Sequence, residues 1–213
     1  MEGTVVITND QLAGQGQRGN HWESEPGKNL TFSIIFRPTF IPVDKQFRLT
    51  MSIALGIADC LNRLATGFLV KWPNDIYYGD RKICGILIHN TVNGDTISNA
   101  VIGIGLNVNQ HSFRQPRAIS LANILEEELD LPFLLEDVCE HIEKRYLQLK
   151  LGEGQRLKSQ YLQRLMGFGE HRLYTDGSDF SGRIVDVHEN GQLEIERHDG
   201  SKLYGFKEVE FIF

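Results

Sequence analysis

The chain has 213 residues, of which 41% are hydrophobic and 23% are charged, and its formal net charge is −6 at pH 7. This composition favours a globular protein, while the negative charge and the lack of a helix-turn-helix before the first expected strand argue against DNA binding. No apolar run approaches the roughly 20 residues of a membrane helix, and residues 1–10 do not resemble a secretory signal, so we expect a cytoplasmic protein without membrane contact.

The first part of the chain mixes strand and helix patterns. Period-two and β-branched patterns predict strands over Thr4–Thr8 and Leu30–Phe36, with a Gly-rich polar segment at residues 14–27 between them. Apolar residues at helical spacing predict a helix over residues 45–65 that packs on a sheet. Strand-like runs joined by turn signals follow at residues 69–72, 76–78, 82–89 and 100–104.

The second part begins with helical patterns. Ser120 is the expected N-cap of a helix over residues 121–128, and apolar residues predict two further helices over residues 135–149 and 156–165. After Gly167, short β runs alternate with Asp-Gly and Asn-Gly turns, which predicts a small barrel.

These patterns together predict an α+β fold in two domains. Residues 1–166 would form a mixed β-sheet with helices on one face, and residues 167–213 would form the small C-terminal β-barrel. The cysteines Cys60, Cys84 and Cys139 are odd in number and have apolar neighbours, which favours buried, reduced thiols. No Cys or His pair has the spacing of a zinc site, so no transition metal is implied.

The Gly-rich segment is the first candidate for ligand binding. Gly14, Gly16 and Gly19 would allow backbone amides to approach an anion, while Arg18 adds a cation and Trp22 a flat surface for a ring. The segment has neither the Walker nor the Rossmann pattern. A flexible surface loop is the alternative interpretation.

Two further segments contain polar residues beside turns or strand glycines. The sequence Lys-Trp-Pro-Asn-Asp at residues 71–75 places an amide and a carboxylate at a rigid turn, and Lys82 then begins an apolar strand from which its ammonium could enter a cleft. Gly103 and Gly105 interrupt another strand and could form a pocket floor, with Asn107 at its edge. The alternatives are a structural Asx turn and a β-bulge.

In this order, the three segments resemble the signature of biotin protein ligases. The matching runs are Gly-x-Gly-x-Arg-Gly-Asn-x-Trp-x-Ser with Pro-Gly-x-Asn-Leu, then Lys-Trp-Pro-Asn-Asp with Arg-Lys-x-x-Gly-Ile-Leu, and then Ile-Gly-Ile-Gly-Leu-Asn-Val. Residues from Phe180 onward resemble the SH3-like C-terminal domain of the family. The resemblance therefore covers nearly the whole chain and implies a biotin/lipoate ligase-like sheet followed by an SH3-like barrel.

The resemblance implies an ATP-dependent biotin–acetyl-CoA-carboxylase ligase. Such an enzyme forms biotinyl-5'-adenylate from biotin and ATP, with Mg²⁺ as part of the ATP complex, and transfers biotin to a lysine of a biotin carboxyl carrier domain. Lys82 aligns with the lysine that neutralises charge at the α-phosphate, and Arg18 is the expected loop cation. The other implied contact residues are Gln11, Gly14, Gln15, Gly16, Gln17, Trp22, Asn74, Asp75, Gly85, Ile86, Gly103 and Asn107.

Two departures from the family pattern leave alternatives open. Gln15 and Gln17 are neutral where many relatives carry arginine, and a lost charge-assisted hydrogen bond weakens binding by about 1.5–3 kcal/mol. The resemblance also begins inside the domain, without the strand, helix and Ser-Thr-Asn turn that relatives use to bind biotin. The alternatives are a degenerate module that binds biotin, nucleotide or acceptor without turnover, and a lipoate or octanoate ligase relative. The sequence leaves a homodimer open.

Overall fold

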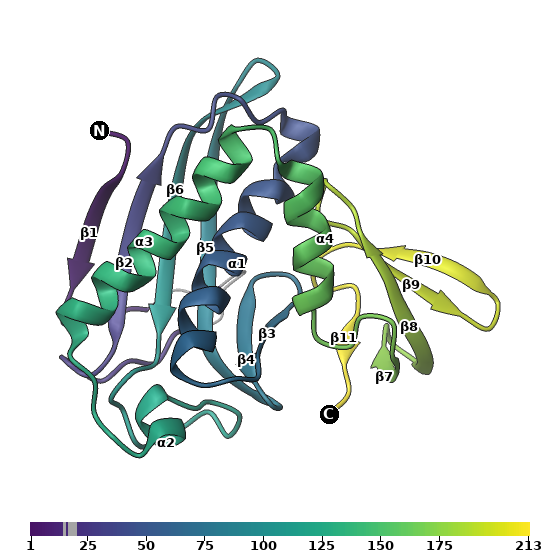
Figure 1. The fold of residues 1–213 in the computed structure, drawn as a ribbon. Coiled ribbons are helices and arrows are strands. Elements are labelled where there is room, and N and C mark those ends of the chain that lie inside the picture. Colours follow the sequence, from purple (N-terminus) through teal and green to yellow (C-terminus); the bar gives the residue numbers. More distant parts are fainter. Residues whose placement is uncertain (15, 17–20) are drawn as a thin grey trace.

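The strands form two antiparallel sheets in the computed structural model, which describes residues 1–14, 16 and 21–213 (Figure 1). The first sheet has the strand order β1-β2-β6-β5-β4-β3. Its strands are β1 (Thr4–Thr8), β2 (Leu30–Phe36), β3 (Phe68–Lys71), β4 (Asp75–Tyr78), β5 (Arg81–Asn93) and β6 (Thr96–Leu106). The expected strands are therefore present, and β5 and β6 are longer than predicted because they extend to the Asn-Gly turn.

The α+β class is confirmed, with a more specific sheet than the mixed one predicted. All pairings between neighbouring strands of the first sheet are antiparallel. Strands joined by short turns, such as β5 and β6, must be antiparallel because parallel neighbours require a long crossover. The parallel pairings in the described part of the chain are isolated bridges, such as the one between Lys82 and Ala118.

The main helices cover one face of the first sheet (Figure 1). They are α1 (Phe47–Leu64), α3 (Leu131–Lys150) and α4 (Gly154–Arg164), with a short 3-10 turn η2 (Val43–Lys45) before α1. The short helix α2 (Leu121–Leu125) lies beyond one end of the sheet (Figure 1). α1 is buried along most of its length, and Gly56 allows α3 to approach it closely, since a Cβ there would lie 2.7 Å from the Ile142 Cα. No helix in the described ranges is both long and apolar enough to cross a membrane.

Two helix boundaries differ from the sequence prediction. Ser120 caps α2 as expected, through a reciprocal capping box with Asn123, but α2 ends at Leu125 because Glu126 adopts a left-handed conformation (φ 60°). α3 begins at Leu131, four residues before the predicted start, because the Asp130 side chain accepts a hydrogen bond from the Phe133 N–H and caps the helix.

The second sheet has the order β10-β9-β8-β7-β11. Its strands are β7 (His171–Thr175), β8 (Asp179–Val187), β9 (Leu193–Arg197), β10 (Gly200–Tyr204) and β11 (Glu210–Phe211). This arrangement is compatible with an SH3-like fold. The described strand pairings do not join β10 to β11, so closure into a barrel stays a prediction, as does the domain division after residue 166.

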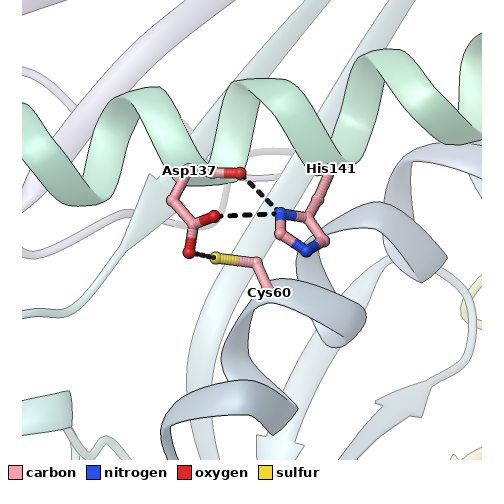
Figure 2. A group of neighbouring side chains, drawn as sticks. All are labelled: Cys60, Asp137 and His141. Carbon is pink, nitrogen blue, oxygen red and sulfur yellow. Dashed lines mark hydrogen bonds and ion pairs between the residues drawn. The ribbon is translucent and has the colours of Figure 1, made fainter.

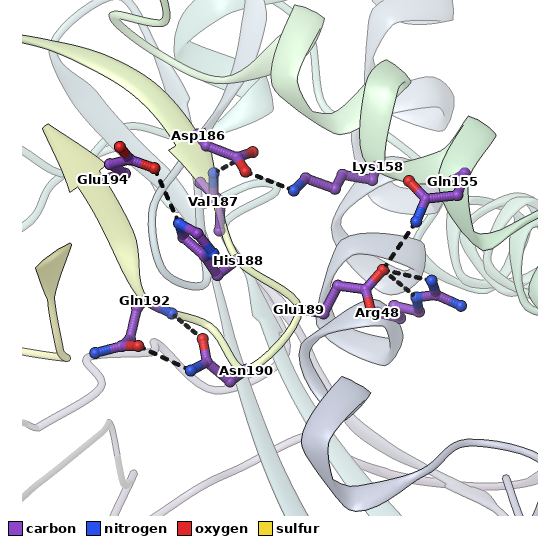
Figure 3. Close-up of polar contacts among 10 residues, drawn as sticks. All are labelled: Arg48, Gln155, Lys158, Asp186, Val187, His188, Glu189, Asn190, Gln192 and Glu194. Carbon is purple, nitrogen blue, oxygen red and sulfur yellow. Dashed lines mark hydrogen bonds and ion pairs between the residues drawn. The ribbon is translucent and has the colours of Figure 1, made fainter. Parts of the chain in front are cut away.

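Polar side chains connect the second sheet to the helices (Figure 3). The Glu189 carboxylate accepts hydrogen bonds from the guanidinium of Arg48 on α1, and the Lys158 ammonium of α4 lies 2.7 Å from Asp186 of β8. These groups are partly buried, which makes the pairs more effective than fully exposed ones. The second sheet is thus held against α1 and α4.

Trp72 also links the second sheet to the first. Its ring is 2% exposed, its Nε1–H donates to the Gly191 backbone oxygen at 3.0 Å, and its centroid lies 5.5 Å from that of Phe206. Because Trp72 directly precedes the Pro-Asn-Asp turn, this contact ties the turn to the second sheet. The predicted polar turn is therefore held by both sheets.

Candidate functional site

The candidate site lies on the face of the first sheet opposite α1 and α3. Along β6, Ile102 and Ile104 are buried, while Gly103 and Gly105 alternate with them and point to the other face. In the strand register, Gly105 lies between Thr31 of β2 and Gly85 of β5. Small side chains next to one another on this face leave a trough in the sheet surface. The glycines thus form the floor that the sequence predicted.

A cavity of about 360 Å³ occupies this trough, and we call it cavity 1. Besides the floor, its walls include Val6, Thr8, Thr31 and Ser33. The predicted site residues that line it are Gln11, Gly16, Trp22, Asn74, Asp75, Lys82, Gly85, Ile86 and Gly103. Three segments that are far apart in the sequence therefore meet at one cavity. The predicted Gln15, Gln17 and Arg18 lie outside the described residues.

Lys82 projects its ammonium into this region at the beginning of β5. Its Nζ lies 2.6 Å from the Asp75 Oδ1 and 5.8 Å from the centre of the Trp22 ring. Its side chain is 33% exposed and that of Asp75 is 15% exposed, so the pair is partly shielded from water. A Cβ on Gly85 would lie 3.3 Å from the Lys82 Nζ, so the absence of a side chain there gives the ammonium its space.

Asn74 braces the turn rather than pointing freely into cavity 1. Its Nδ2 donates to the Ile86 backbone oxygen, and its own backbone oxygen accepts the Ile86 N–H at 2.9 Å. This side chain therefore has a structural role, but through a contact with β5 rather than through the local bonds of an Asx turn. The brace fixes the position of the adjacent Asp75, which pairs with Lys82.

The Trp22 indole packs directly against the backbone of Gly105, a contact that only glycine permits. A Cβ on Gly105 would clash with the indole, lying 2.7 Å from Cζ2 and Nε1 and closer still to Cε2. The Trp22 N–H donates to the Gly14 oxygen at 3.0 Å, and a Cβ on Gly14 would clash with the Trp22 backbone. Gly14 therefore shapes the site from outside the cavity lining. The Trp22 Nε1 is buried and has no hydrogen-bond partner among the described residues.

A second cavity, of about 440 Å³, lies on the other side of Trp22 and Lys82, and we call it cavity 2. Both side chains line both cavities. Cavity 2 is also lined by Asn107, which is 2% exposed and whose Nδ2 donates to the Ile119 oxygen at 3.0 Å. The Asn107 Oδ1 is buried and, within the described part of the chain, lacks a hydrogen-bond partner. Asn107 thus belongs to cavity 2 rather than to the floor of cavity 1.

The outer wall of cavity 2 is a loop that the sequence prediction missed. Phe113, Gln115, Pro116, Arg117 and Ala118 line it. The Lys82 N–H donates to the Arg117 oxygen at 2.6 Å, and the Ile119 N–H donates to the Lys82 oxygen at 3.0 Å. The Arg-Gln-Pro-Arg run at residues 114–117 was the available signal, since it places two cations beside a turn residue in the segment after the strand that contains Gly103 and Gly105.

Aromatic residues from the end of the second sheet support this wall. The Phe213 ring stacks on Tyr77 with centroids 6.0 Å apart, and the Arg117 Cζ lies 4.6 Å from the Phe213 centroid. Close by, the Lys71 Nζ lies 4.7 Å from the Phe211 centroid, and burial lowers the pKa of Lys71 below its usual value. Cavity 2 is thus backed by the second sheet.

Cys60, Asp137 and His141 form a cluster between α1 and α3 that has the side chains of a metal site (Figure 2). The Asp137 carboxylate accepts from the Cys60 thiol at 3.4 Å and from Arg63 at 3.1 Å. The His141 Nδ1 lies 2.8 Å from the Asp137 backbone oxygen and 3.2 Å from its Oδ1, so this nitrogen must carry a proton. The contacts from Cys60 and Arg63 to Asp137 join α1 to α3.

Comparisons with known proteins all point to one protein family. Residues 1–107 match the model of the biotin/lipoate A/B protein ligase family. The chain is 30% identical over 217 residues to the bifunctional ligase/repressor BirA of Bacillus subtilis, covering 98% of this chain and 66% of that protein. It is 27% identical over 206 residues to a biotin–acetyl-CoA-carboxylase ligase of Mycobacterium tuberculosis, covering 92% of this chain and 74% of the relative.

The fold is also similar to a solved structure. The biotin protein ligase of Aquifex aeolicus, in complex with biotin and ATP, superimposes with a TM-score of 0.83 at 24% identity, covering 100% of this chain and 90% of that chain. The chain spans just under two thirds of the length of the bifunctional relatives from Bacillus that it matches.

Proposed function

The chain belongs to the biotin/lipoate A/B protein ligase family, and from this premise we propose that it activates biotin with ATP and transfers the biotinyl group to a lysine of a biotin carboxyl carrier domain. One observation carries the proposal. Among the described residues, the two cavities share the Lys82 ammonium and the Trp22 indole. Such a junction suits an enzyme that joins two ligands.

Cavity 1 suits the acid. Its floor of glycines admits a compact bicyclic ring, and the hydroxyl-bearing side chains of Thr31 and Ser33 in its wall are suited to the polar edge of such a ring. The solved Aquifex aeolicus relative was crystallised with biotin and ATP, which supports the same pair of ligands here.

Cavity 2 suits the nucleotide. The buried Asn107 Oδ1 can accept a hydrogen bond from the exocyclic amino group of adenine, and Trp22 offers a flat surface beside it. Phe113 and Pro116 supply apolar contacts from the outer wall. ATP would enter as its Mg²⁺ complex.

In the first step, a carboxylate oxygen of biotin attacks the α-phosphorus of ATP, and the bond to the β-phosphate oxygen breaks. Two anions must approach each other, and the Lys82 ammonium at the junction of the cavities offsets that repulsion. Asp75 holds the ammonium in place, at 2.6 Å. Pyrophosphate leaves, and biotinyl-5'-adenylate remains across the two cavities.

In the second step, the unprotonated amine of the acceptor lysine attacks the carbonyl carbon of the mixed anhydride. The carbon–oxygen bond to the phosphate breaks and AMP leaves, while the amine nitrogen loses a proton. Water would compete with the amine for the mixed anhydride. The segment that carries Trp22 would therefore also cover the intermediate and keep water away from it. Arg18, Gln15 and Gln17 belong to the same segment, and their contribution stays a prediction.

The acceptor and the compartment follow from this activity. A biotin carboxyl carrier domain of a carboxylase would supply the lysine for this reaction, and we propose the cytoplasm as the compartment. We keep a homodimer as part of the proposal.

The test is ATP–pyrophosphate exchange measured with biotin, lipoate or octanoate, followed by the intact mass of a carrier domain incubated with the enzyme, biotin and MgATP. We expect exchange that depends on biotin and the mass increase of one biotinyl group. Exchange that occurs with lipoate or octanoate but not with biotin would instead indicate a lipoate or octanoate ligase. Calorimetric binding of biotin without exchange would instead identify a module that does not turn over.

A further inference from the structure

Asn29 belongs to the Pro-Gly-x-Asn-Leu run of the sequence signature, yet it lines neither cavity 1 nor cavity 2. It is 5% exposed, at the beginning of β2. Its Oδ1 accepts the Val108 N–H at 2.9 Å, and its Nδ2 donates to the Ser24 Oγ at 3.1 Å and to the Gln110 Oε1 at 2.7 Å. Both N–H donors and the carbonyl oxygen of this buried amide therefore connect other segments.

Gln110 completes the connection from the other side. It is 1% exposed, and its Oε1 also accepts the Glu25 N–H at 3.0 Å. Its Nε2 donates to the Ser112 oxygen at 2.8 Å. Two amides that lie 81 positions apart in the sequence thus form one buried unit.

The segments joined by this unit are the two walls of cavity 2. Ser24 and Glu25 follow Trp22 by two and three residues, and Ser112 immediately precedes the loop of residues 113–118. Glu23 adds a further link between the walls, since its carboxylate accepts the Arg114 N–H at 3.0 Å and 3.2 Å. The position of Trp22 relative to the loop therefore depends on the amide pair.

We propose that Asn29 and Gln110 are a positioning pair that sets the Trp22 segment against the 113–118 loop and so shapes cavity 2 for a purine nucleotide. The identity of the nucleotide rests on the proposed function, whereas the link between the two walls rests on the hydrogen bonds alone. Because neither amide reaches the ligand cavities, the pair acts on nucleotide affinity through the walls.

Asn109 provides a matched control on the same segment. It is 6% exposed, its Nδ2 donates to the Leu129 oxygen at 2.8 Å, and its Oδ1 accepts the Leu129 N–H at 2.9 Å. It is thus a buried amide next to Gln110 with both its nitrogen and its oxygen bonded, but its partner lies before α3 and away from both cavities. Asn29→Asp and Asn109→Asp make the same chemical change, from an amide donor to an acceptor, at comparable burial.

The first experiment measures the affinity of each variant for α,β-methylene-ATP and for biotin by calorimetry. In Asn29→Asp the two donations from Nδ2 are lost, and a carboxylate faces the Gln110 oxygen. We expect nucleotide affinity to fall about tenfold, the factor that corresponds to one buried hydrogen bond, while biotin affinity stays within twofold. Asn109→Asp should lower the melting temperature similarly without changing nucleotide affinity. Equal losses in the two variants, or no loss in Asn29→Asp, would overturn the proposal.

The second experiment needs no ligand, so it separates this inference from the proposed function. The chain has two tryptophans, and Trp72→Phe leaves Trp22 as the fluorescent reporter. In that background, acrylamide should quench Trp22 more strongly in Asn29→Asp than in the parent or in Asn109→Asp. Unchanged quenching would refute the positional link even if the enzyme is active, and increased quenching would support it even if biotin-dependent exchange is absent. Gln110→Glu, which keeps the Oε1 acceptor and loses only the donation to Ser112, replaces Asn29→Asp should the latter not fold.

Discussion

Alanine at Gly105 tests how Trp22 is seated at the junction of the two cavities. A Cβ there would lie 2.7 Å from the Trp22 Cζ2 and Nε1, which is too close for either group to remain in place. Gly103 lies two residues earlier on the same face of β6, and its Cβ would meet the Leu87 oxygen at an ordinary 3.6 Å. The two substitutions therefore share a strand and a backbone effect and differ in the clash with the indole.

The expected difference follows from two opposing effects. Replacing glycine by alanine at a compatible position stabilises the fold by about 0.4–1 kcal/mol, because the unfolded chain has fewer conformations. That gain should apply in full to Gly103→Ala. In Gly105→Ala, forcing a methyl group against a packed ring costs about 1–3 kcal/mol, so its free energy of unfolding should lie below that of Gly103→Ala by roughly this amount.

The assay is urea denaturation of both variants, with Trp22 fluorescence recorded in the Trp72→Phe background. Gly105→Ala should be less stable, should show a changed Trp22 emission, and should raise the KM for ATP, because the indole lines cavity 2. If Gly105→Ala matches Gly103→Ala both in stability and in Trp22 emission, the indole does not pack against Gly105 and the reasoning is wrong.

Three further predictions concern other parts of the molecule. Lys82→Ala should lower biotin-dependent pyrophosphate release by about 10²–10³-fold, while the free energy of unfolding changes by less than about 1 kcal/mol; near-normal release would dismiss its role. Phe213→Ala should raise the KM for ATP about two- to fivefold without changing the KM for biotin, because it removes the ring beside Arg117. Steady-state kinetics measure both constants, and an equal change in the two would contradict this prediction. Hydrogen bonding, chiefly from Lys202, lowers the pKa of Asp176 from 3.8 to about 2, so its stabilising effect is complete above the unfolded value and disappears as the pH falls through the folded one. Asp176→Asn should therefore melt below wild type at neutral pH and approach it near pH 2, and a pH-independent difference would contradict this.

Local patterns in the sequence were sufficient for most of the fold. The alternation in Leu30–Phe36 gave β2 its correct limits, and Ser120 was correctly identified as a helix cap. Where the prediction was wrong, the cause lay in single residues. Glu126 ends α2 by adopting a positive φ, which is uncommon for glutamate, and Asp130 begins α3 before its apolar face starts.

The candidate site was predicted where glycine or a polar turn interrupts an apolar run. Gly103 and Gly105 are such positions, and both line cavity 1. The loop of residues 113–118 could not be found in this way, because it becomes a wall only through the hydrogen bond between Lys82 and Arg117, 35 positions apart. The Asn29–Gln110 pair is a contact of the same kind, invisible until β2 and the end of β6 are adjacent.

The most direct test is a crystal structure of this chain with a stable phosphodiester analogue of biotinyl-5'-adenylate. We predict that the linking phosphate lies within hydrogen-bonding distance of the Lys82 Nζ, with the acyl arm over Gly103 in cavity 1 and the purine beside Trp22 and Asn107 in cavity 2. An analogue bound elsewhere, or a Lys82 ammonium that points away from the phosphate into solvent, would contradict the account.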